Sequence, residues 1–190
     1  MTPKLSKLNK LFAGTLAIAI CASSVQAQSQ AEAQTQTEAR AVIYAKEVID
    51  LPRRDVWEDW ATAEGLESFF AQEAVIDMRP GGDYVVVFDE TAPDGSKGND
   101  YGQVLGFQYE NMLHVTWSMP PYMPKIRPHL TSLQLEFNWI DDDTTELRLF
   151  HTGFGDSNDW DEGIAYFEEV WPAVLSRYKE IVEAEAKDDK

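Results

Sequence analysis

The chain has 190 residues and a formal net charge of −17 at pH 7, from 33 acidic and 16 basic side chains. Its single cysteine excludes an internal disulfide framework and a metal site built from several cysteines. Such a negative surface would repel a phosphate backbone, so we expect no nucleic-acid partner.

Residues 1–27 have the layout of a secretory signal peptide. Three lysines precede the apolar run LFAGTLAIAI, and Val25 and Ala27 supply small side chains ahead of a cleavage point. The run is too short to span a bilayer, so no membrane span is expected in the mature protein. Cleavage near Ala27 would remove Cys21 and three positive charges, leaving 190 − 27 = 163 residues with a net charge of −17 − 3 = −20. We therefore expect export to the periplasm or beyond the cell.

Residues 28–39 are rich in Gln, Ala and Thr and contain no large apolar side chain. Because such a segment cannot bury apolar surface, it is expected to be a flexible linker ahead of a domain spanning 40–187. The first expected element is a strand in AVIYAKEVI, where Val42, Tyr44 and Val48 lie among small or charged neighbours.

Two short helices are expected next. Pro52 suits the first turn of a helix, where its missing N–H would be unpaired in any case. Val56 and Trp60 follow at helical spacing, and the segment AEGLESFF places Leu66 and Phe70 on one side of a second helix.

From residue 73 the pattern changes to strands joined by turns, which predicts an antiparallel meander. Six segments are enriched in β-branched or aromatic residues: EAVIDM, DYVVVFDE, DYGQVLGFQY, NMLHVTW, TSLQLEFNWI and TELRLFHT. The corner Pro80-Gly81-Gly82 is followed by a strand, without a lysine, whereas a phosphate-binding loop needs a helix that faces the anion. We interpret it as a turn in which one glycine takes a positive φ.

The segment MPPYMPKIRPH, residues 119–129, contains four prolines and is expected to form a long loop. Its Lys125 and Arg127 either draw an anionic ligand toward a cavity mouth or balance local acidity. A long helix is expected to follow, because apolar residues recur at steps of three and four. This apolar stripe consists of Trp160, Ile164, Phe167, Trp171, Val174, Tyr178 and Ile181.

This order of strand, two helices, six strands and one long helix resembles the helix-grip fold of the START-like (SRPBCC) superfamily. The segments VWEDWATAEGLESFF, IDMRPGGDYVV and GQVLGFQYENMLHVTW resemble the family of the heat-shock protein 90 ATPase activator homologue, as do LQLEFNWIDDDTTELRLFHTGF and the final DW…GIAYFEEVWPAVLSRY. The resemblance covers roughly residues 40–182.

The resemblance implies an α+β fold, in which a curved antiparallel sheet wraps around the long C-terminal helix. It also implies a cavity between sheet and helix that often takes an apolar small molecule, but no shared catalytic residue. The family's name comes from a cytosolic co-chaperone, and an exported protein would not meet that chaperone. A chaperone partner is therefore not expected.

Strand periodicity indicates which side chains face the long helix. Leu133, Leu135, Phe137 and Trp139 share one face of their strand, and Leu147, Leu149 and His151 share a face of the next. Glu136 and Arg148 lie on the opposite faces, where we expect them to pair in solvent. The candidate ligand-binding residues are Trp117, Phe137, His151, Phe167 and Trp171.

His151 is a weak catalytic candidate, because it ends an otherwise apolar strand face. It is either a polar handle or general base at the cavity floor, or a histidine satisfied by a nearby backbone carbonyl. His114 and His129 are expected to be structural or exposed. Because the three histidines are scattered, we expect no metal site, and nothing indicates another cofactor.

Three functions remain open on this basis. The leading hypothesis is an exported START-like domain that binds a small, largely apolar molecule, because the chain has six Trp, nine Phe and seven Tyr. The alternative is a hydrolase or cyclase that uses His151 or a cavity carboxylate with a bound water. The third hypothesis is a protein-interaction module that docks a partner through the sheet or the proline-rich loop.

Overall fold

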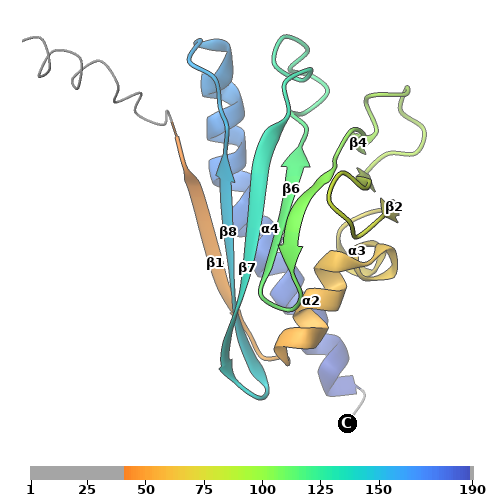
Figure 1. The fold of residues 1–190 in the computed structure, drawn as a ribbon, viewed down its shortest axis with the longest axis vertical. Coiled ribbons are helices and arrows are strands. Elements are labelled where there is room, and N and C mark those ends of the chain that lie inside the picture. The colour runs from red at the N-terminus through yellow and green to blue at the C-terminus, as the bar shows by residue number, and fades with distance from the viewer. Residues whose placement is uncertain (1–40, 189–190) are drawn as a thin grey trace, which may run out of the picture. The chain divides into compact units, whose positions relative to one another are not determined.

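The computed structural model describes residues 41–188, so the predicted signal peptide and the whole of the predicted linker lie outside the described residues. The expected α+β arrangement, with an antiparallel sheet and a long C-terminal helix, is confirmed (Figure 1). The elements are β1 (Ile43–Ile49), α2 (Arg53–Ala61), α3 (Ala63–Phe69), β2 (Glu73–Ile76), β3 (Tyr84–Val87), β4 (Gly98–Asn99), β5 (Val104–Gln108), β6 (Met112–Trp117), β7 (Thr131–Asp141), β8 (Thr144–Thr152) and α4 (Asp159–Asp188).

The strands form two antiparallel sheets, with the orders β1-β8-β7-β6-β5 and β2-β3-β4. Sequence reasoning predicted one meander and missed β4, which has only two residues and no side-chain pattern that would reveal it. The first strand lies beside the last strand, because β1 pairs with β8. The five-stranded sheet lies across α4, which Figure 1 shows crossing behind the strands.

The Pro80-Gly81-Gly82 turn joins the two sheets, and its interpretation as a turn is confirmed. Gly81 has φ +78°, and its N–H donates to the carbonyl oxygen of Val104 at 2.7 Å. The N–H of Val104 donates in return to the carbonyl of Gly82 at 2.9 Å. A Cβ at Gly82 would lie 2.1 Å from the carbonyl oxygen of Asp77, so this position has no room for a side chain.

Strand periodicity gave the correct buried faces over most of the large sheet. Leu133, Leu135 and Phe137 are buried, as are Leu147 and Leu149 on β8. Trp139, at the end of the same β7 face and beside a register shift, is 58% exposed.

The predicted pairing of Glu136 with Arg148 is wrong, although the two residues are opposite each other in register. Arg148 Nε instead donates to Glu146 Oε1 at 2.6 Å, two residues along the same strand. Glu136 accepts a hydrogen bond from Gln134 at 3.0 Å. Glu146 and Arg148 project from the same face of β8, which allows this ion pair along the strand.

The predicted apolar stripe of α4 is displaced by one residue in its second half. Trp160, Phe167, Trp171 and Tyr178 are buried as expected. Beyond Trp171, however, Leu175 and Val182 are fully packed, whereas Val174 and Ile181 are only partly buried. This displacement turns Val174 away from the core and toward the side of the helix where the cavity lies.

Candidate ligand-binding cavity

The space between α4 and strands β7 and β8 is filled by packed side chains. The His151 ring centre lies 4.5 Å from that of Phe167 and 4.7 Å from that of Phe154. Leu133 and Leu149 are at most 1% exposed. These residues therefore belong to the packed core between α4 and the inward faces of β7 and β8.

A cavity of about 350 Å³ lies instead on the neighbouring side of α4, between that helix, the small sheet and the loop that follows β6. It is lined by Phe70, Phe88, Gly98, Asn99, Trp117, Ser118, Met119, Pro120, Pro121, Tyr122, Arg127, Tyr166, Phe167, Val170, Trp171 and Val174. Tyr122 and Phe88, which are 62% and 41% exposed, mark the side that opens to solvent.

Aromatic rings form most of the wall. Phe167 and Trp171 stack at 5.6 Å on the helix side, and Trp117 meets Trp171 edge-on at 5.2 Å. Phe70 contacts Phe88 at 5.0 Å across the other wall. Edge-on and stacked ring contacts of this kind are favourable arrangements of aromatic side chains, so the rings of this wall also stabilise one another.

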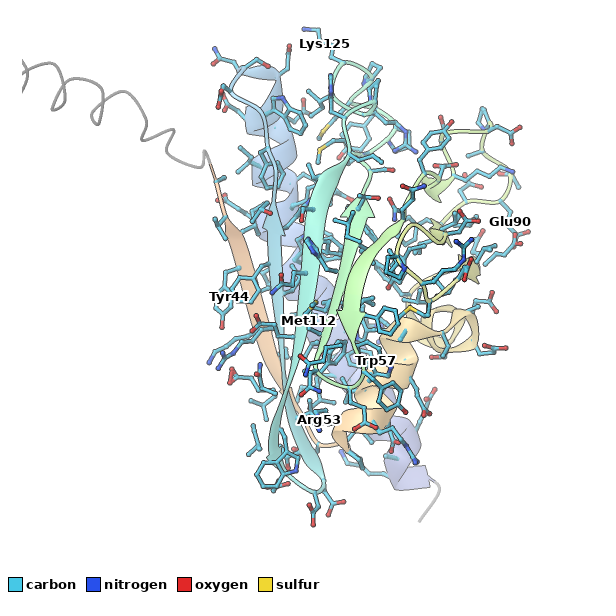
Figure 2. The ribbon with its side chains drawn as sticks, in the orientation of Figure 1. Tyr44, Arg53, Trp57, Glu90, Met112 and Lys125 are labelled. Carbon is cyan, nitrogen blue, oxygen red and sulfur yellow. The ribbon has the colours of Figure 1, made fainter. Side chains whose placement is uncertain are left out.

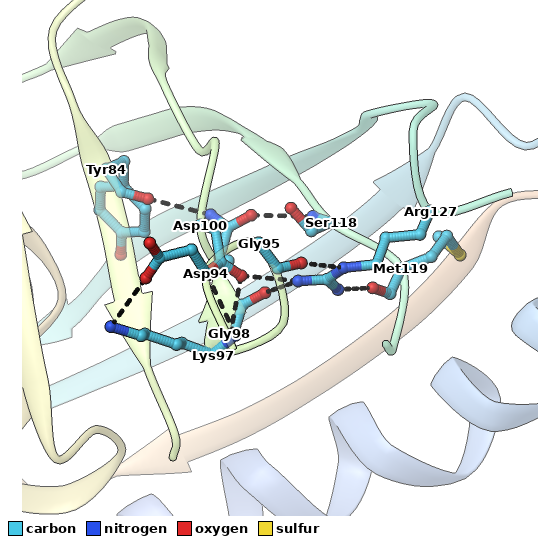
Figure 3. A network of polar contacts seen from close by, with 10 residues as sticks. Tyr84, Asp94, Gly95, Lys97, Gly98, Asp100, Ser118, Met119 and Arg127 are labelled. Carbon is cyan, nitrogen blue, oxygen red and sulfur yellow. Dashed lines mark hydrogen bonds and ion pairs between the residues drawn. The ribbon is translucent and has the colours of Figure 1, made fainter. Parts of the chain in front are cut away.

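Arg127 fixes the proline-rich loop over the cavity, and Figure 3 shows the network around its guanidinium. Nε donates to the carbonyl of Gly95 at 2.7 Å, and Nη2 donates to Gly98 at 2.9 Å and to the Asp100 carboxylate at 2.6 Å. Nη1 donates to the carbonyl of Met119. The loop is therefore tied to the segment that contains β4.

Lys125 lies at the tip of the same loop (Figure 2) and donates to Asp159 at 2.7 Å. Because Asp159 and the Arg127 partner Asp100 are both carboxylates, these two cations neutralise local acidity. The geometry thus favours the second of the two interpretations given to them from sequence. It does not support a role in drawing an anion toward the cavity.

Asn99 connects the small sheet to the end of β6 underneath the cavity. Its Nδ2 donates to the carbonyls of Tyr84 at 2.9 Å and Thr116 at 3.1 Å, and its Oδ1 accepts from the N–H of Ser118 at 2.8 Å. The Ser118 hydroxyl is different. Its oxygen is buried and has no hydrogen-bond partner among the described residues.

His151 lies behind the wall rather than in it. Trp171 Nε1 donates to His151 Nδ1 at 2.9 Å, and His151 Nε2 lies 2.6 Å from Thr131 Oγ1. Thr131 donates its hydroxyl proton to the carbonyl of Trp117 at 2.9 Å, so Nε2 carries the imidazole proton. Burial lowers the pKa of His151 to about 3. A neutral imidazole with both nitrogens occupied is satisfied structurally and has no free nitrogen to act as a base.

The other histidines agree with their sequence interpretation. His114 is half-buried, with Nε2 2.6 Å from Ser132 Oγ, and burial lowers its pKa. His129 is exposed in the proline-rich loop. No group of three His, Cys, Asp or Glu side chains within residues 41–188 is placed to hold a metal ion.

Three of the five candidate ligand-binding residues line the cavity, namely Trp117, Phe167 and Trp171. Phe137 does not line it, because its ring packs edge-on against Trp57 at 5.2 Å, and neither does His151. Sequence reasoning missed Phe70, Phe88, Tyr122 and Tyr166, together with the loop residues 118–121. For the loop residues the signal was the run of prolines around Tyr122 in MPPYMP.

A shallower pocket of about 240 Å³ continues the cavity along α4. It shares Phe70, Val170 and Val174 with the cavity and adds Phe69, Ala173 and Arg177. The two spaces are therefore adjacent and have mainly apolar linings, with Arg177 at the outer one. We refer to them together as the α4 groove.

A family model for the Activator of Hsp90 ATPase homolog 1-like proteins matches residues 50–183, most of the chain. The chain belongs to this family. The match begins after β1 and contains every residue that lines the α4 groove. The resemblance inferred from sequence is thus confirmed.

Solved structures show the same fold at low sequence identity. Protein NE0264 from Nitrosomonas europaea is 18% identical, with a TM-score of 0.60 over 79% of this chain and 99% of its own. The Aha1 dimer from Colwellia psychrerythraea is 16% identical, with a TM-score of 0.55 over 74% of this chain and 94% of its own. CalU16 from Micromonospora echinospora is 19% identical, with a TM-score of 0.52 over 74% of this chain and 73% of its own.

No curated protein matches the chain in sequence. Within residues 41–188, no helix is long and apolar enough to cross a membrane.

Proposed function

We propose that this member of the Activator of Hsp90 ATPase homolog 1-like family is an exported module that binds a small, largely apolar ligand beside α4. The observation that carries the proposal is a cavity of about 350 Å³ with seven aromatic side chains among its lining residues. Ligand pockets in proteins typically start near 300 Å³ and combine apolar walls with a few polar groups. Here the polar side chains of the lining are Asn99, Ser118 and Arg127, together with the hydroxyl groups of Tyr122 and Tyr166.

The composition of the wall favours binding over catalysis. The side chains that line the cavity include no carboxylate and no histidine. Its titratable groups are Arg127 and the phenols of Tyr122 and Tyr166, and burial raises the pKa of both phenols. General acid–base chemistry near neutral pH needs a group that titrates near the working pH. A hydrolase or cyclase reaction would therefore have to rely on groups of the ligand itself.

The export part of the proposal rests on the sequence of residues 1–27 alone. Expression of the full chain in a Gram-negative host, followed by fractionation and intact-mass measurement, tests it. We expect a periplasmic or secreted product whose mass corresponds to cleavage near Ala27. Recovery of the uncleaved chain from the cytosol would contradict the proposal. It would also remove the reason for not expecting a chaperone partner.

Ligand binding is tested with a neutral fluorescent probe, N-phenyl-1-naphthylamine, whose emission rises in an apolar site. Val170→Trp should abolish the rise, because Val170 lines both parts of the α4 groove and the indole would fill the space. Val75→Trp is the matched control, since Val75 is 47% exposed on β2 and lines neither space.

Probe binding that is saturable, lost in Val170→Trp and kept in Val75→Trp would support the assignment. Equal binding by both variants would place the probe elsewhere and overturn it. Absence of any saturable binding by the native protein, to this probe or to a lipid and aromatic library in native mass spectrometry, would also overturn it.

A further inference from the structure

We propose that the ligand of the α4 groove is uncharged and elongated, and that it places a hydrogen-bonding group against Ser118. This inference rests on the proposed function and specifies its ligand. Three features of the groove carry it: the pairing of Arg127, which is the cation that lines the cavity itself, the unpartnered hydroxyl, and the continuation of the cavity along the helix.

The cation next to the cavity is already neutralised. Arg127 forms an ion pair with Asp100 at 2.6 Å, and each of the two side chains is only 10% exposed. Four of its five N–H donors are bonded to protein oxygens. A ligand carboxylate placed here would lose its hydration without gaining an unpaired positive charge, which is unfavourable in an apolar site. The net charge of −17 adds long-range repulsion of anions.

A cationic ligand fits no better. The lining residues of the cavity include no carboxylate, and the nearby Asp100 is occupied by Arg127 and by the N–H groups of Lys97 and Gly98. The aromatic wall alone would have to replace the hydration of the cation. An uncharged ligand avoids both costs.

Ser118 supplies the polar contact that an uncharged ligand needs. The residue is 5% exposed, lines the cavity, and its hydroxyl oxygen has no partner within the described chain. A buried hydroxyl without a hydrogen bond is costly and uncommon. Because a serine side chain has three staggered rotamers, its hydroxyl can turn to meet a ligand group in the cavity that the residue lines.

The shape of the ligand follows from the shared wall. Phe70, Val170 and Val174 are apolar and line both the cavity and the shallower pocket, so an apolar chain that spans both would lie against these three side chains. Ala173 belongs only to the outer part. A compact ligand would leave that part empty, whereas an alkyl chain of about ten carbons has the extent to occupy both.

Displacement of N-phenyl-1-naphthylamine by matched aliphatic probes tests the inference on the full-length mature protein. The probes are 1-decanol, decanoate, 1-chlorodecane and 1-hexanol at pH 7.5. We expect 1-decanol to displace the probe at least about tenfold more tightly than decanoate, because the carboxylate would be buried without a partner. We also expect 1-decanol to bind at least about tenfold more tightly than 1-hexanol, since its added methylene groups are buried in the outer part of the groove.

Two variants assign the contacts. Ser118→Ala should weaken 1-decanol by about fivefold to tenfold, as expected for loss of one hydrogen bond, and should leave 1-chlorodecane unchanged; Ser118→Thr should keep the alcohol preference. Ala173→Trp should weaken 1-decanol but not 1-hexanol, because only the longer chain reaches the outer part.

Equal or tighter binding of decanoate would overturn the uncharged ligand while leaving the groove as a binding site. An unchanged alcohol affinity in Ser118→Ala would overturn the Ser118 contact, and an unchanged 1-decanol affinity in Ala173→Trp would overturn the elongated shape. Failure of the fluorescent probe itself to bind would instead overturn the proposed function.

Discussion

Trp171 Nε1 donates a hydrogen bond to His151 Nδ1 across 2.9 Å, and this bond joins the cavity wall to the packed core behind it. On its other side, His151 reaches Thr131, which bonds the carbonyl of Trp117. The ring of Trp171 and the main chain of Trp117, two residues that line the cavity, are thus linked through His151 and Thr131. We therefore expect His151 to hold Trp171 in place behind the wall rather than to contact a ligand.

His151→Ala should lower the free energy of unfolding by about 2–4 kcal/mol, because it leaves buried polar groups unpaired and a void in the core. Urea denaturation followed by circular dichroism measures this change. His151→Gln, which keeps a donor and an acceptor, should recover part of the loss. A fully stable His151→Ala protein would show that the chain of hydrogen bonds is dispensable.

His151 also predicts a loss of stability in acid. Its pKa is about 3 in the folded protein against 6.5 for an ordinary histidine, so between these values the unfolded state binds a proton that the folded state does not. The contribution of this residue to stability therefore falls as the pH drops from about 6.5 toward 3. In His151→Gln this part of the pH dependence should disappear from a series of denaturation curves.

For Asp59 we expect the opposite pH dependence, in which the stability contributed by the residue falls as the pH rises. It accepts a hydrogen bond from the Tyr178 hydroxyl at 2.8 Å, but burial, reinforced by the neighbouring Asp55, Glu58 and Glu185, raises its pKa to about 6. Between pH 3.8 and 6 the folded state holds the extra proton, so the charged carboxylate costs stability as the pH rises through this window.

Asp59→Asn should therefore raise the melting temperature at pH 7.5, and the gain should shrink toward pH 4.5. The amide oxygen still accepts from Tyr178, so that hydrogen bond is retained. Differential scanning calorimetry at the two pH values measures the effect. An equal change in melting temperature at both values would mean that the charge of Asp59 is not the cause.

Arg127→Met should destabilise the protein by about 3 kcal/mol, since it leaves the buried Asp100 carboxylate without its cation. It should also expose the proline-rich loop to limited proteolysis, measured by mass spectrometry of the fragments. Lys125→Ala is the control, because its ion pair with Asp159 is solvent-exposed and contributes little. The double variant Arg127→Met, Asp100→Asn should regain part of the stability but not the protease resistance.

Variants of Phe137 and Trp117 distinguish a packing role from a ligand-binding role among the candidate residues chosen from sequence. Phe137→Leu should lower stability by about 1 kcal/mol, as a conservative change in a packed core does, without altering probe affinity. Trp117→Leu should reduce probe affinity, because Trp117 belongs to the wall. Isothermal titration of both variants measures the difference, and a matching loss of affinity in Phe137→Leu would place the site nearer to β7.

Sequence reasoning located most elements because their signals are local. Alternation revealed β7 and β8, and the three- and four-residue spacing revealed α4. The cavity is a different kind of feature, since it depends on where two apolar faces fail to meet. Periodicity identifies the inward side of Phe137 and of Trp117 equally well, but only the fold brings Trp57 against the first and leaves space beside the second.

The wall contributed by residues 118–121 and Tyr122 was missed for a related reason. Prolines exclude regular pairing and leave no period from which to infer the direction of a side chain. The position of this loop is fixed instead by Arg127 and by partners about 30 residues away in the sequence. No local pattern reports such a contact.

Three of the four protein groups that receive hydrogen bonds from Arg127 are main-chain carbonyls, those of Gly95, Gly98 and Met119. Every residue type offers such a carbonyl, so the anchor places no demand on the side chains of Met119 or of the neighbouring Pro120 and Pro121. Natural variation or laboratory selection can therefore change the chemistry of this wall while the loop stays in place. The contacts that hold the loop are thus separate from the side chains that line the cavity.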